Sequence, residues 1–127
     1  MTVTSIGMTA ALGSLQQALD APRQPAAALG SWRWTVRQRM AAVRDVLVAE
    51  VDAAAGAPLA ARESSMLRER NALLGRLSAL GPAVLESSRV EDVRNDLRRL
   101  VADVAHHAQR LHDLAYDEVE LELGGSE

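Results

Sequence analysis

The chain of 127 residues contains no cysteine, no phenylalanine and no lysine, and only 2% of it is aromatic. Without cysteine it cannot form disulfides, thiolate metal sites or a thiol nucleophile, and a reducing compartment is the default expectation. The aromatic residues Trp32, Trp34 and Tyr116 are too few for the base-stacking platform that single-stranded nucleic acids require.

A long apolar run and an excess of basic charge are also missing. No segment approaches the roughly 18 apolar residues of a membrane span, and the N-terminus lacks the basic and apolar regions of a signal peptide. The 14 basic residues are all arginines interleaved with 17 acidic residues, which gives a formal net charge of -3. Nucleic-acid binding normally depends on a basic excess. We therefore expect a cytoplasmic protein that binds neither nucleic acid nor membrane.

Motifs that carry catalysis are absent as well. The sequence has no glycine-rich phosphate loop, no dinucleotide-binding fingerprint and no serine in a nucleophile elbow. Acid-base or nucleophilic catalysis needs converging groups in a pocket, and the sequence does not indicate such a group. We therefore expect a protein that is not an enzyme and uses no cofactor.

Three segments show apolar residues spaced three and four apart, which is the period of a helix buried on one face. They cover about residues 31–54, 59–80 and 90–118. Gly56 and Pro58 separate the first two, and Gly81 with Pro82 is expected to kink or interrupt the second. Because such short connections favour antiparallel neighbours, the sequence predicts an all-α, up-down-up bundle of three long helices.

The two ends of the chain differ from these segments. Residues 1–30 are rich in Ala, Gly, Pro, Ser and Thr, and we expect a flexible arm with at most one short helix near residues 15–20. Val119, Leu121 and Leu123 alternate with glutamates, which is the period of a strand. The predicted organisation is an arm over 1–30, a bundle over 31–118 and an extended acidic tail over 119–127.

All three histidines fall in "DVAHHAQRLHDL" at residues 103–114 of the third segment. A helix turns by about 100° per residue. Relative to Val104 on the apolar stripe, His107 then lies about 60° to one side, His112 about 80° to the other, and His106 about 160° away. The sequence therefore predicts three divergent imidazoles that cannot share one ion.

Two roles stay open for this segment. In the first, Arg70 pairs with Asp103 beside His107 and forms a polar layer of the core, while Glu50 is partly exposed. In the alternative, Asp103 and either His106 or His107 bind a metal together with Glu69 on the second helix. The guanidinium of Arg70 favours the first role, because a cation suits a carboxylate and repels a metal ion.

Two stretches, "MLRERNALLGRL" at 66–77 and "LRRLVADVAHHAQRLHDLAYDEV" at 97–119, resemble the second half of a hemerythrin-like bundle. That family implies a helical bundle holding two irons with imidazoles and bridging carboxylates. Glu69 matches its acidic position, but Arg70 stands where an imidazole belongs. His107 matches the later histidine, but Leu111 replaces the carboxylate. The resemblance therefore implies a degenerate ligand set. The tail "DLAYDEVELELGGSE" is also similar to that of small actinobacterial helical proteins with no assigned activity.

Association with another protein or with a second copy is the function that this sequence favours. Trp34 is expected to point outward on the first helix with Arg37 beside it, a combination typical of interface hot spots. The apolar positions of the tail, Val119, Leu121 and Leu123, together with Tyr116, offer a second contact surface that could add a strand to a partner.

Overall fold

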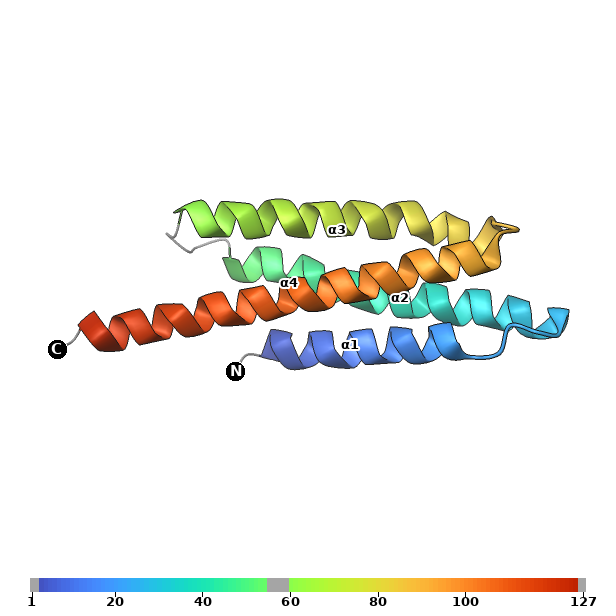
Figure 1. The fold of residues 1–127 in the computed structure, drawn as a ribbon, viewed down its shortest axis with the longest axis horizontal. Helices are drawn as coiled ribbons and strands as arrows, with labels where there is room; N and C mark the ends of the chain where they lie inside the picture. Colours follow the sequence, from blue (N-terminus) through green and yellow to red (C-terminus); the bar gives the residue numbers. More distant parts are fainter. Residues whose placement is uncertain (1–2, 55–59, 126–127) are drawn as a thin grey trace.

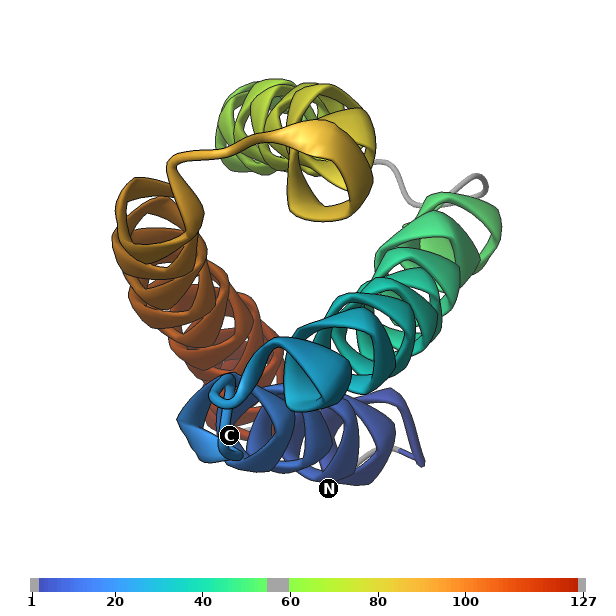
Figure 2. The same ribbon diagram turned by 90° about the vertical axis from the view of Figure 1, so that its right-hand side faces the viewer.

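The computed structural model describes the backbone of residues 3–54 and 60–125 and the side chains of residues 7–50 and 64–114. The described backbone forms four helices and no strand: α1 (Val3–Asp20), α2 (Ala26–Ala54), α3 (Ala60–Glu86) and α4 (Val90–Gly125). Helices α1 and α3 each contact both α2 and α4, so the four surround one core (Figure 2). Consecutive helices run in opposite directions (Figure 1). The protein is therefore a four-helix, up-down-up-down bundle. The all-α fold was predicted, but the arm that was expected to hold at most one short helix contains the 18-residue helix α1.

The core contains the apolar stripes that the sequence predicts. The most deeply buried side chains are Met8, Leu15 and Leu19 of α1, Trp32, Val36, Met40, Val43 and Leu47 of α2, Leu73, Leu77 and Val84 of α3, and Val93, Leu97, Leu100 and Val104 of α4. Each aliphatic side chain removed from water contributes about 1.5–3 kcal/mol to folding. The predicted helical periodicity of all three long segments is confirmed.

Both chain ends are more helical than predicted. Instead of a flexible arm over 1–30, α1 covers Val3–Asp20 and α2 already begins at Ala26. Alanine is the best helix former, and α1 gains further from burying Met8 and Leu15 in the core. The extended tail was also wrong, since α4 continues through Gly125. Glutamate and leucine are good helix formers, so alternation alone does not produce a strand without a pairing partner. Residues 126 and 127 lie outside the described part.

Helix α3 runs through Gly81 and Pro82 to Glu86, so of the predicted kink or interruption at 81–82 the interruption does not occur. Proline at this point removes one backbone donor close to the end of the helix, where few helical bonds follow. Arg33 of α2 supports this end by donating hydrogen bonds to the carbonyls of Val84 and Ser87, each at 2.9 Å. A side chain at Gly81 would lie 3.2 Å from Nε of Arg37, so glycine also gives α2 room against α3.

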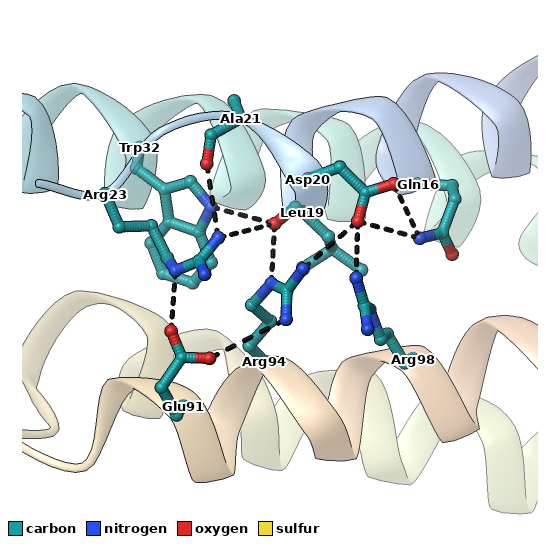
Figure 3. A network of polar contacts seen from close by, with 9 residues as sticks. All are labelled: Gln16, Leu19, Asp20, Ala21, Arg23, Trp32, Glu91, Arg94 and Arg98. Atoms are coloured by element: carbon teal, nitrogen blue, oxygen red, sulfur yellow. Dashed lines mark hydrogen bonds and ion pairs between the residues drawn. The ribbon is translucent and has the colours of Figure 1, made fainter.

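The C-terminal end of α1 is held by side chains from three elements (Figure 3). The carbonyl of Leu19 accepts hydrogen bonds from Trp32 Nε1 at 3.4 Å, Arg23 Nη1 at 3.1 Å and Arg94 Nε at 2.8 Å. Helices leave their last carbonyls without a partner inside the helix, and Pro22 prevents α1 from continuing. The side chains therefore replace the glycine cap that many helices use.

Asp20 and Glu91 connect the same end of α1 to α4. Asp20 Oδ1 accepts hydrogen bonds from Arg98 at 2.6 Å and Arg94 at 3.2 Å, and Glu91 binds Arg23 at 2.8 Å. The Arg98 hydrogen bond is the largest of the influences that hold the pKa of Asp20 below its ordinary value. These contacts join residues far apart in the sequence and fix where α1 lies against α4.

Replacing Arg94 by alanine should lower the free energy of unfolding by about 1 kcal/mol. The effect is moderate because Leu19 keeps two other donors and Asp20 keeps Arg98. Urea denaturation measures it, with Arg99→Ala as the matched control. Arg99 is exposed and pairs with Asp96 within α4, so its loss should change stability by less than about 0.5 kcal/mol. Equal effects of the two substitutions would contradict the role given to Arg94.

Candidate functional site

The three histidines of α4 point in different directions, as predicted. His107 is 1% exposed and belongs to the core, whereas His106 and His112 are exposed. Their divergence follows from the helical rotation between successive positions. No two of them meet, and the chemistry of this helix depends on the environment of His107.

His107 lies between two carboxylates from different helices. Its Nε2 is 2.9 Å from Glu50 Oε2 on α2, and its Nδ1 is 2.6 Å from Glu69 Oε1 on α3. The other oxygen of Glu69 forms an ion pair with Arg110 on α4. We call these four residues the buried polar cluster, although Arg110 itself reaches the surface. The cluster links three helices at one level of the bundle.

Electrostatics favour a protonated His107. Burial, the largest single influence, disfavours the charged ring, but hydrogen bonds and charge from Glu50 and Glu69 together outweigh it and raise the pKa of His107. Burial also acts against the charged form of Glu69, yet the bonds from His107 and Arg110 lower the pKa of that carboxyl. An imidazolium donates from both nitrogens, so negative and positive groups alternate from Glu50 at the core to Arg110 at the surface.

The predicted pairing of Arg70 with Asp103 and the predicted partial exposure of Glu50 were wrong. Asp103 pairs with Arg76 at 2.7 Å, and Glu50 is 5% exposed and bound to His107. Arg70 is buried at 4% exposure, as expected for a position near the stripe, but no partner of its Nε is found. A polar layer is therefore present, but other residues form it. The axial register of the antiparallel helices places different side chains opposite one another from those that the sequence suggested.

The residues predicted for the alternative metal site do not assemble into one. Glu69 and His107 are in contact, while Asp103 and His106 line a surface pocket of about 270 Å³ beside Glu69, Arg76 and Arg110. Both ring nitrogens of His107 are already bound to carboxylates, and two guanidinium groups line the pocket. Among the described residues, no three His, Asp or Glu side chains are placed to hold a metal ion. The donor set does not fit a metal centre.

A second candidate site lies on the outside of α2 and α3. The large apolar side chains exposed within the described part are Trp34 at 62%, Leu85 at 44% and Val48 at 39%. Trp34 and Val48 share one side of α2, and Arg33, next to Trp34, binds the carbonyls that flank Leu85. We call this surface the association face and define it by Trp34, Arg37, Arg44, Val48 and Leu85. Trp34 is exposed, as predicted.

The other predicted contact residues belong to the far end of α4. The side chains of Tyr116, Val119, Leu121 and Leu123 lie outside the described part, although the backbone there is helical. Figure 1 shows that the last turns of α4 project beyond the other three helices. One chain therefore does not unite these residues with Trp34 in a single surface. The position of Leu85 near Trp34 was not predicted, because Leu85 lies beyond Gly81 and Pro82, where the second helix was expected to kink or stop.

Comparisons with models of protein families, with characterised proteins and with solved structures give no match to this chain. No described helix combines the length and apolar character needed to cross a membrane.

Proposed function

We propose that this protein is a non-catalytic helical bundle of the cytoplasm that acts by binding another protein chain through its association face. The observation that carries the proposal is the exposure of Trp34 beside arginines on a helix that is otherwise well packed. Tryptophan and arginine are among the residues enriched in binding hot spots. Covering a tryptophan that is 62% exposed removes apolar surface from water, which favours association.

The arginines of this face add charge to the apolar contact. Arg37 and Arg44 lie three and ten positions after Trp34, which places all three near one side of α2. No carboxylate among the described side chains forms an ion pair with Arg37 or Arg44, in contrast to Arg76 and Arg94, which pair with acidic groups. An acidic surface with an apolar centre is the partner chemistry that this face favours.

Site-specific photo-crosslinking tests the proposal. With p-benzoylphenylalanine at position 34, irradiated cells should give several-fold more crosslinked product than with the same group at Asn95. Asn95 is also exposed but lies on α4, diagonally across the bundle from α2 (Figure 2). Adding Arg37→Glu and Arg44→Glu should reduce the product at position 34. Equal yields at 34 and 95 would contradict the proposal.

A further inference from the structure

The charges of this chain are separated between two segments. Residues 23–44 contain five arginines and no acidic residue, whereas arginines and acids are interleaved over residues 45–112. Residues 113–127 contain six acidic residues and neither lysine nor arginine. The acidic segment also holds Val119, Leu121 and Leu123 between its glutamates. It therefore combines negative charge with apolar side chains, which complements the association face in both respects.

The acidic segment cannot reach the association face of its own chain. Helix α4 reaches α2 across the core, where His107 bonds Glu50. Trp34, Arg44 and Val48 are exposed on the outer side of α2, away from that contact. Helix α4 is also diagonal to α2 in the bundle (Figure 2). Any contact between the two surfaces therefore joins different molecules.

The acidic end of α4 is also placed for such a contact. Its last turns extend past α1, α2 and α3 (Figure 1), so none of the other described helices lies alongside them. The backbone remains helical to Gly125. On a helix Val119 and Leu123 share one side, so the sequence of this projecting end combines apolar residues with acidic ones.

We propose that the association face of one molecule binds the acidic end of α4, residues 113–125, of a second copy. This inference rests on the proposed function and names its partner. The two surfaces differ, so the contact is head-to-tail, and each bound molecule leaves one surface of each kind for the next. Ion pairs at an exposed interface weaken with salt, so assembly decreases as ionic strength rises.

Charge reversal on each surface tests the inference by sedimentation velocity at low salt. The wild-type chain should exceed its single-chain mass of 13.6 kDa in a concentration-dependent way. Arg37→Glu/Arg44→Glu and, separately, Glu120→Arg/Glu122→Arg should each sediment as single chains, with dissociation constants raised by about tenfold or more. An equal mixture of the two variants should assemble again, because each reversed surface meets an opposite charge on the other variant.

The control is Arg39→Glu/Arg68→Glu, which changes the net charge equally at exposed arginines outside the association face and should leave assembly intact. Circular dichroism confirms that all variants keep their helical content. A wild-type chain that stays at 13.6 kDa, or a mixture that does not recover, overturns the inference. If position 34 then crosslinks to a different protein, the proposed function still holds and only the self-association is refuted. Equal crosslinking at positions 34 and 95 would refute both the proposed function and the self-association.

Discussion

Replacing His107 by leucine should lower the free energy of unfolding by about 3–5 kcal/mol, the usual cost of removing one member of a buried charge pair. The substitution leaves the carboxylate of Glu50, which is 5% exposed, without its partner at 2.9 Å. It also removes one of the two partners of Glu69. The cost comes mainly from the stranded charge, because leucine itself suits the core.

A double substitution separates the stranded charge from lost packing. Glu50→Met combined with His107→Leu removes both groups and should recover most of the loss, since apolar replacement of a whole buried ion pair is often neutral or stabilising. Urea denaturation of the two single variants and the double variant gives the coupling energy. His106→Leu is the matched control, because that histidine is adjacent and exposed. Additive losses in the double variant would show that Glu50 and His107 do not act as a pair.

The helical stripes could be predicted because they depend on local spacing alone. Trp32 and Val36 lie four positions apart on α2, Leu97 belongs to the corresponding stripe of α4, and all three are buried. The full length of helix α1 was not predicted because its residues include Gly7, Gly13 and many small side chains. Such residues show little difference in hydrophobicity between the buried and the exposed side of a helix. Its stability comes from packing on α2 and α4, and that information lies far away in the sequence.

The candidate site was predictable only in part. The direction of His107 followed from its rotation relative to Val104, since both sit on one helix. The identity of its partners depends on how far α2 and α3 slide along α4, and the turn residues do not determine that distance. Glu50 carried a usable signal, because it continues the stripe of Val43 and Leu47 by three positions. That spacing indicates burial, which for a carboxylate requires a partner such as His107.

The buried polar cluster should also make stability depend on pH in a defined direction. The pKa of His107 is raised in the folded protein, so its contribution is fully present below the ordinary histidine value of 6.5 and is lost as the pH rises through the raised value. Between these two values the unfolded chain binds one proton fewer than the folded chain. The free energy of unfolding should then fall by up to about 1.4 kcal/mol per pH unit.

Glu69 acts on the acid side with the opposite sign. Its pKa is lowered, so its contribution is present above the ordinary value of 4.5 and is lost as the pH falls through the lowered value. The cluster therefore contributes most between about pH 4.5 and pH 6.5, the interval that these two ordinary values bound.

Urea denaturation at half-unit steps from pH 5.5 to pH 9 measures the alkaline decline. Wild type and His106→Gln should lose stability in parallel, because His106 is exposed and His107 remains in both. The double variant Glu50→Met/His107→Leu should lack the decline, since it has neither the titrating ring nor the carboxylate that raises its pKa. If the double variant declines as steeply as wild type, the alkaline loss belongs to other groups, and His107 does not carry its charge in the folded protein.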